Sequence, residues 1–285
     1  MGVGDSDPNA MRGQSLTPVL GALRRAAEDD ILRCEHRLHV RCELPAPNMA
    51  ELFETMKGND RVGIISLMDH TPGQRQWQDV EQARVYYCGK KGWSSAQFDL
   101  QAARERELQA MHAPANRRAV VSYARTHGIV LASHDDTLPE HVLEAHADGV
   151  SISEFPTRLE AAQSARRQAM SIVMGAPNVV RGGSHSGNVA AMDLARSGLL
   201  DALSSDYVPA SLLLAAFRLV NDAGFSLPQA VATVTSGPAR AARLVDRGEL
   251  CLGKRADLVQ VHLVDAAGSM HPVVRAVWRD GRRVV

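Results

Sequence analysis

Aromatic side chains are scarce in this 285-residue chain, at 4% of the residues, whereas 45% of the residues are hydrophobic. That apolar fraction is ordinary for a globular protein and large enough to form one sizeable core. The core must therefore be built mostly from small aliphatic side chains. Such a composition favours α/β layers, in which helices pack closely on a parallel sheet.

An excess of charge of one sign is also missing, because 32 Lys and Arg balance 32 Asp and Glu and the isoelectric point is near 7.2. A basic excess is the usual mark of nucleic-acid binding, so we expect no nucleic-acid partner. No apolar run approaches the roughly 20 residues of a membrane helix. The first residues lack the basic and apolar regions of a signal peptide. We therefore expect a cytoplasmic protein with no membrane partner.

Cysteine is rare too, and the four cysteines contain no C-x-x-C pair. This spacing argues against a zinc ribbon and against a thioredoxin-like motif. A reducing compartment is the simpler interpretation of such a pattern, in agreement with a cytoplasmic location.

Short apolar runs alternate with helical patterns from residue 35 onward. The runs that we predict as strands are 35–44, 61–69, 128–136, 149–156, 170–178 and 200–206. Alternation of this kind predicts a parallel sheet made of βαβ units. Each run turns polar at its C-terminal end, where (β/α)8 barrels hold their active sites, so the pattern indicates part of such a barrel.

The first run shows the clearest alternation, since His39, Arg41 and Glu43 share one parity and Val40 and Cys42 share the other. Side chains of one parity leave a strand on one face, so the polar set would point toward the barrel axis. A solvent-facing edge strand is the alternative interpretation of the same pattern.

The end of the chain changes character. An apolar helix is predicted at 209–224, followed by a helix pair around Gly237 and Pro238. From there on the sequence predicts β-strands, with hairpin turns at Ala267-Gly268 and Asp280-Gly281. We expect two domains, an incomplete barrel over 1–245 and the C-terminal part of a small β-sandwich, present as hairpins, over 246–285.

Metal-ligand residue types end several predicted strands: Glu43 the first, His70 the second, His134 the third and Asp206 the last. A hydrolytic metal site needs imidazole and carboxylate groups that converge on one point with a position open for water. A single residue of this kind is more often a helix cap or a structural hydrogen-bonding group. Its recurrence at one end of successive strands leads us to predict Glu43, His134 and Asp206 as ligands of a common metal.

A glycine-rich segment after the fifth run is a candidate phosphate site. Its residues are Arg181, Gly182, Gly183, Ser184 and His185. A guanidinium, hydroxyl groups and an exposed glycine backbone ahead of a helix can surround phosphate oxygens. A flexible loop is the alternative.

Two further arginines are candidates for substrate binding. Arg41 lies on the polar face of the first run, and Arg75 follows a Pro-Gly turn after the second run. A guanidinium at such a place would suit an anionic ligand. For Arg75 a surface role stays open.

Long motifs in the chain resemble a known family. GELCLGKRADLVQV and the preceding SGPARAARL are similar to the C-terminal signature of the amidohydrolase superfamily. EHRLHVRCEL, SLMDHTPGQRQ, ASHDD, MGAPNVVRGGSHSGNVAA and LSSDYVPASLL resemble, more specifically, the diphosphatase family of the carbon–phosphorus lyase pathway. This resemblance covers essentially the whole chain.

The resemblance implies hydrolysis of a small phosphorylated sugar phosphonate, ribose 1-methylphosphonate 5-triphosphate, to the 5-phosphate and pyrophosphate in phosphonate catabolism. It also implies a divalent metal, with zinc expected. Asp206 would bind this metal and carry the catalytic proton, and His134 matches the family's fifth-strand histidine. Glu43 matches a third-strand carboxylate, whereas Glu154 stands where many relatives carry a histidine. A ligand role for Glu154 or His70 stays open.

The chain departs from the family at its start. The family's first barrel strand carries a His-x-His or His-x-Asp pair, and no histidine precedes His36 here. The opening GVGDSDP resembles the end of the second barrel strand, so we expect a barrel without its first two strands and with open sheet edges that favour self-association. An inactive homologue with a binding or scaffold role, another amidohydrolase activity such as deacylation or deamination, and a homo-oligomer all stay open.

Overall fold

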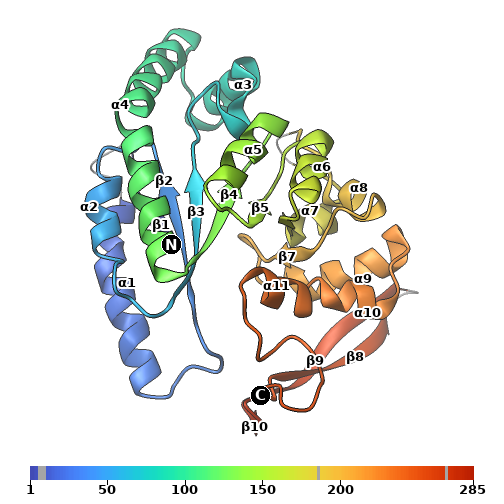
Figure 1. The fold of residues 1–285 in the computed structure, drawn as a ribbon. Helices are drawn as coiled ribbons and strands as arrows, with labels where there is room; N and C mark the ends of the chain where they lie inside the picture. Colours follow the sequence, from blue (N-terminus) through green and yellow to red (C-terminus); the bar gives the residue numbers. More distant parts are fainter. Residues whose placement is uncertain (6–10, 185–186, 267–268) are drawn as a thin grey trace. The chain divides into compact units, whose positions relative to one another are not determined.

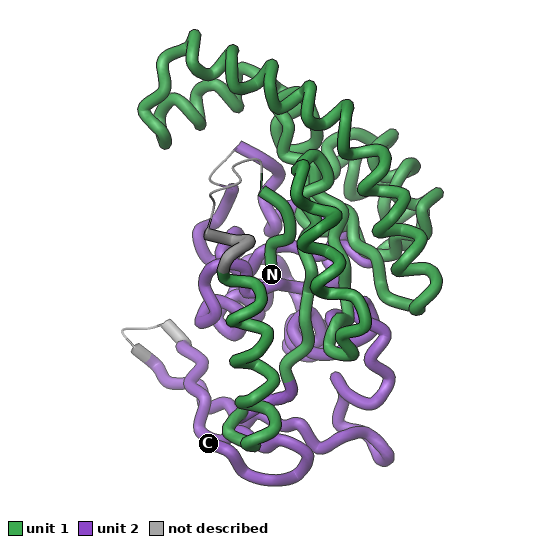
Figure 2. Tube along the Cα trace, turned by 90° about the vertical axis from the view of Figure 1, so that its left-hand side faces the viewer, with its two compact units in different colours: residues 1–32, 36–170 green, residues 33–35, 171–285 purple. Residues whose placement is uncertain are grey.

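The computed structural model describes residues 1–5, 11–184, 187–266 and 269–285. The chain forms two compact units, residues 1–32 with 36–170 as unit 1 and residues 33–35 with 171–285 as unit 2 (Figure 2). None of the helices within the described ranges combines the length and apolar character that a membrane span requires.

Unit 1 contains a parallel sheet whose strands each pair with the next one in the chain. The strands are β1 (Gly2–Val3), β2 (Leu38–Glu43), β3 (Val62–Met68), β4 (Val130–His134) and β5 (Ile152–Glu154). In β2 the buried Val40 and Cys42 alternate with the half-buried His39, Arg41 and Glu43. The predicted parallel strands and the predicted parity of the first run are confirmed.

Helices connect and cover these strands (Figure 1). They are α1 (Met11–Glu28), α2 (Met49–Glu54), the 3-10 turn η1 (Arg75–Trp77), α3 (Val80–Lys91), α4 (Ser95–His127), α5 (Pro139–Ala147) and α6 (Leu159–Arg167). The charged segment 78–127 forms two helices, because Gly92 adopts a left-handed φ of 68° that ends α3. Ser94 and Gln97 then form the capping box that starts α4.

Unit 2 contains two more parallel strands and a separate antiparallel sheet. The strands β6 (Ser171–Gly175) and β7 (Ala202–Ser204) pair with each other, and the antiparallel sheet has the order β10 (Arg282–Arg283), β9 (Ser269–Arg279), β8 (Leu258–Ala266). The helices are α7 (Ala176–Arg181), α8 (Ala191–Arg196), α9 (Ser211–Ala223), α10 (Leu227–Ala232) and α11 (Ser236–Ala241). The apolar face of α9, with Ala215, Ala216 and Leu219 buried, packs among α7, α8 and α10.

Three features differ from the sequence predictions. The first is that the edge of β2, which was expected to be open, is covered in part, because β1 at the chain start pairs with Arg41 and Cys42 of β2. The helix α1 was not predicted either. The break between α10 and α11 lies before Gly237 and Pro238, which belong to the first turn of α11. A Cβ at Gly237 would lie 2.1 Å from the carbonyl oxygen of Asp201, so glycine lets α11 approach β7 closely.

The C-terminal hairpins follow the prediction where they are described. Asp280 and Gly281, with φ values of 49° and 76°, form the turn between β9 and β10. Positive φ at both central positions is the geometry of a type I′ hairpin turn. The turn predicted at 267–268 lies outside the described residues. The domain boundary at residue 245 stays a prediction.

Candidate metal centre

Three side chains at the C-terminal ends of β3 and β4 form a cluster of metal-ligand type. The ligand atoms of His70, His134 and Asp135 all lie within 4.8 Å of one another. The Nε2 atoms of His70 and His134 lie 3.7 and 3.4 Å from Oδ2 of Asp135. Two imidazoles and one carboxylate are a donor set that suits a divalent ion such as zinc.

The backbone at Asp135 supports this geometry. Asp135 directly follows β4 and has a φ of 57°, in the left-handed region that non-glycine residues seldom adopt. Strained residues of this kind are found at sites where a side chain must be aimed. Here the strain directs the carboxylate toward both imidazoles.

Two glutamates form hydrogen bonds with the Nδ1 atoms of the two imidazoles. Nδ1 of His70 lies 2.6 Å from Oε2 of Glu43, whose Oε1 also accepts the backbone N–H of His70 at 3.0 Å. Nδ1 of His134 lies 2.8 Å from Oε2 of Glu154. Carboxylates in this position orient a metal-binding imidazole and raise its basicity. In the structure Glu43 and Glu154 therefore contact the histidines, and the Nε2 atoms face Asp135.

Arg41 and Ser66 complete the hydrogen-bond network. Arg41 donates to Nε2 of His134 at 3.1 Å, which requires a lone pair on Nε2 and the proton on Nδ1. Ser66 donates to Glu154 at 2.9 Å and therefore accepts the N–H of His39 at 2.5 Å. The lone pair that a metal would use is thus already presented by the tautomer of His134.

The pKa values follow from these contacts. Burial alone would lower the pKa of His70, but the Glu43 and Asp135 carboxylates outweigh it and raise this pKa to about 10. Burial alone would raise the pKa of Glu154, but the adjacent His134 lowers it to about 2. The pKa of Glu43 is lowered in the same way, because His70 outweighs burial. Both carboxyl groups are therefore ionised at neutral pH.

A cleft of about 710 Å³ in unit 1 is lined by Glu43 and His70. Arg41 also lines it, and α3 contributes Tyr86, Lys90 and Lys91. The cleft therefore extends from His70 of the candidate metal centre to the basic and aromatic C-terminal end of α3. Its volume is in the range of small-ligand pockets.

The predicted metal ligands have different positions. His134 is a member of the cluster, and Glu43 holds His70 by hydrogen bonds. Asp206 follows β7 in unit 2, is exposed, and donates its backbone N–H to Oγ of Ser204 at 3.2 Å. Its roles as ligand and proton carrier stay predictions.

The predicted substrate-binding residues also differ in burial and in their contacts. Arg75 is only 5% exposed, and its guanidinium contacts the carboxylates of Asp136 and Glu144. Arg181 is exposed and is the last residue of α7, which Gly182 ends with a φ of 82°. A helix C-terminus favours cations and not anions, so the expected dipole support for phosphate does not apply at Arg181. Gly182 is exposed, Gly183 and Ser184 are half-buried, and His185 lies outside the described residues.

The sequence named His70 as a strand-end residue and left its ligand role open, and it did not select Asp135, although Asp135 is adjacent to His134. Position at a strand end was the available signal, but it applies equally to Asp69 and Asp136. Only the directions of the side chains distinguish these neighbours.

The chain is similar to several known proteins. The family model described as Amidohydrolase family matches residues 144–285. The chain is 47% identical over 284 residues, which is 99% of this chain and 74% of the relative, to the alpha-D-ribose 1-methylphosphonate 5-triphosphate diphosphatase of Escherichia coli (strain K12). It is 38% identical over 101 residues, 31% of this chain and 25% of the relative, to an imidazolonepropionase of Streptomyces griseus.

Solved structures that match the chain include a D-hydantoinase, with 12% identity, a TM-score of 0.45, and coverage of 92% of this chain and 74% of the other. The match to the Escherichia coli enzyme extends over nearly the whole chain, with nearly half of the residues identical, and it shows the family to which the chain belongs. The motifs that suggested the family are spread along the same stretch. The chain belongs to the amidohydrolase family, as a relative of alpha-D-ribose 1-methylphosphonate 5-triphosphate diphosphatase.

Proposed function

We propose that this chain hydrolyses alpha-D-ribose 1-methylphosphonate 5-triphosphate, releasing pyrophosphate and leaving the 5-phosphate. The observation that carries the proposal is the 47% identity with the Escherichia coli diphosphatase over 99% of the chain. The cluster at the ends of β3 and β4 gives the activity a chemical basis, because a hydrolase of this family needs converging imidazole and carboxylate donors.

His70, His134 and Asp135 would hold a divalent metal, and zinc suits two imidazoles and a carboxylate. When bound, such a metal polarises a phosphoryl oxygen and lowers the pKa of water. Glu43 and Glu154 keep the two imidazoles oriented through Nδ1. The guanidinium of Arg41, which reaches the same imidazole as Glu154, supplies positive charge for a phosphoryl oxyanion at this end of the cleft.

Other parts of the proposal rest on the family resemblance. Asp206 is proposed to bind the metal and to carry the proton, and the 181–185 segment is proposed to contact phosphate oxygens. Replacing Arg181 with Ala should then raise KM for the triphosphate, because a charge-assisted contact contributes about 1.5–3 kcal/mol. An unchanged kcat/KM would remove Arg181 from the site. A cytoplasmic location and a sandwich domain over 246–285 belong to the same proposal.

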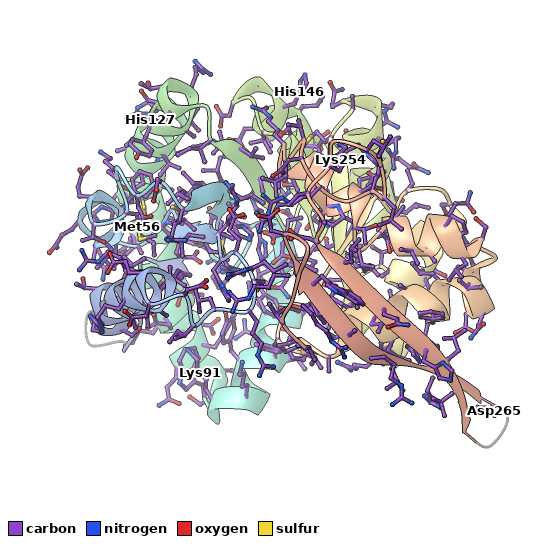
Figure 3. The ribbon with its side chains drawn as sticks, turned by 90° about the horizontal axis from the view of Figure 1, so that it is seen from below. Met56, Lys91, His127, His146, Lys254 and Asp265 are labelled. Atoms are coloured by element: carbon purple, nitrogen blue, oxygen red, sulfur yellow. The ribbon has the colours of Figure 1, made fainter. Side chains whose placement is uncertain are left out.

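The test is pyrophosphate release from the purified full chain loaded with zinc. His134→Ala and Asp135→Asn should each abolish release, whereas His146→Asn, at an exposed position of α5, should leave it unchanged (Figure 3 labels His146). Absence of pyrophosphate from the loaded protein, or full activity in either cluster variant, would contradict the proposal. Turnover of N-acyl or amino substrates instead would favour a deacylase or deaminase, and binding without turnover a scaffold role.

A further inference from the structure

Lysine is rare in this chain, and its distribution is uneven. Only four of the 32 basic residues are lysines: Lys57, Lys90, Lys91 and Lys254. Lys90 and Lys91 are adjacent, lie at the end of α3, and both line the cleft that Glu43 and His70 line. Lys91 is labelled in Figure 3 beside the last turn of α3. Two of the four lysines, Lys90 and Lys91, therefore line the cleft that extends to His70 of the candidate metal centre.

Aromatic rings hold both ammonium groups in place. Nζ of Lys90 donates to the hydroxyl of Tyr86 at 2.8 Å and lies 5.1 Å from the centre of that ring. Nζ of Lys91 lies 4.4 Å from the Trp93 ring centre and 5.3 Å from the Tyr87 ring centre. Tyr86 and Tyr87 pack against the buried Trp77 and Phe98, which fixes this face of α3.

Neither lysine forms a close ion pair in the described part of the chain, although Glu105 lines the same cleft and interacts with Lys91 at longer range. Within the ranges that the structure describes, no carboxylate oxygen lies within 4.0 Å of either Nζ, whereas Nζ of Lys57 lies 2.5 Å from Oε1 of Glu54. An aromatic face attracts an ammonium without cancelling its charge. Because Tyr86 accepts a hydrogen bond from Lys90, its own O–H is available to donate. The arrangement presents two cations and one hydroxyl donor at the cleft.

We propose that Lys90, Lys91 and the Tyr86 hydroxyl bind the diphosphate end of the substrate, the part that leaves as pyrophosphate. The inference rests on the proposed function for the position of the bond that breaks. A diphosphate carries several charges on adjacent phosphoryl groups, which two neighbouring ammonium groups match. The methylphosphonate end carries one phosphorus and needs fewer positive charges. Arg41 lines the same cleft as Glu43 and His70 and would contact the phosphoryl group that is attacked.

The experiment uses the full chain and inorganic pyrophosphate as the probe, with methylphosphonate as the alternative anion. All lysines are acetylated with an amine-reactive label, and the labelled fraction of each is read by mass spectrometry. Pyrophosphate should protect Lys90 and Lys91 and leave Lys57 and Lys254 unchanged, while methylphosphonate protects none. Equal protection of all four lysines, protection by methylphosphonate, or no protection of Lys90 and Lys91 would overturn the assignment.

A matched pair of variants gives an independent readout. Pyrophosphate affinity of the double variant Lys90→Ala/Lys91→Ala should fall about tenfold or more, and that of Lys57→Ala/Lys254→Ala should not change. Wild-type affinity in the first double variant would overturn the assignment. If the chain does not hydrolyse the triphosphate and pyrophosphate still protects Lys90 and Lys91, the proposed function fails and this site stands. If hydrolysis is normal and both lysines stay unprotected, the proposed function stands and this site fails.

Discussion

Glu154 contacts an imidazole of the candidate metal centre, and we expect it to orient that imidazole for metal binding. It is 5% exposed and accepts hydrogen bonds from Nδ1 of His134 and from Oγ of Ser66. Replacing Glu154 with Gln keeps the shape and removes the charge, so metal affinity should fall about 10–100-fold. Titration against a chelator measures this, with Glu160→Gln, at an exposed position of α6, as the control. Equal affinity in the two variants would contradict this role for Glu154.

The titration of His70 should make the metal affinity depend on pH. Its pKa of about 10 means that the metal-free imidazole is protonated at neutral pH, and a metal must displace that proton. Protonation opposes metal binding, so the affinity should rise about tenfold per pH unit from pH 7 toward 10, with release of one proton. In the metal-free protein the stabilisation by the charged imidazole is present below about pH 6.5 and is lost as the pH rises through 10.

The measurement is the apparent metal affinity at several pH values, together with proton release in a weakly buffered solution. His70→Asn should bind metal more weakly and lose the slope that His70 causes. An affinity that stays constant between pH 7 and 9 in the unmodified protein would show that His70 is neutral before the metal binds.

At the scale of elements, the short turn η1 is tied to the segment after β4 by the side chain of Arg75. Its guanidinium contacts Asp136, which is 0% exposed, and lies 3.3 Å from Oε2 of Glu144 on α5. Arg75→Ala leaves the buried Asp136 carboxylate without its charged partner, so the free energy of unfolding should fall by about 3–5 kcal/mol. Urea unfolding measures the loss.

Arg24→Ala serves as the control for Arg75, because Arg24 and Glu28 form an exposed pair on α1. An exposed pair contributes under about 1 kcal/mol, so this variant should unfold nearly as the unmodified protein does. If Arg75→Ala keeps its stability and instead loses affinity for the triphosphate, Arg75 binds substrate as the sequence suggested.

The molecule as a whole has no net charge near neutrality, with an isoelectric point near 7.2. Copies at that pH do not repel one another, and unit 2 exposes apolar side chains, including Leu250 at 88% and Leu252 at 101%. Self-association should therefore be greatest near pH 7 and weaker at pH 9, where the net charge is negative. Light scattering at both values tests this. Equal scattering would exclude net charge as the controlling factor.

The sequence by itself determined the order and type of the central elements. The six predicted strands all occur in the structure, within the predicted runs, because apolar and alternating patterns report directly on burial in a sheet. The parity of His39, Arg41 and Glu43 was correct for the same reason. Strand ends also pointed to His134, since parallel strands bring their carboxyl ends to one edge. The helix α1 was missed; it contains Pro18, a residue that usually interrupts a helix.

Only the tertiary structure decided which polar groups at that edge meet. Glu43 and His70 are 27 residues apart, and Arg41 and His134 are 93 apart, so no local spacing relates them. Their pairing depends on strand register and on the left-handed backbone at Asp135, which turns one of two adjacent aspartates toward the imidazoles. Burial likewise changed the interpretation of Arg75, whose charge is met by two carboxylates from later segments. A sequence states which groups are present, whereas packing fixes the directions in which they point.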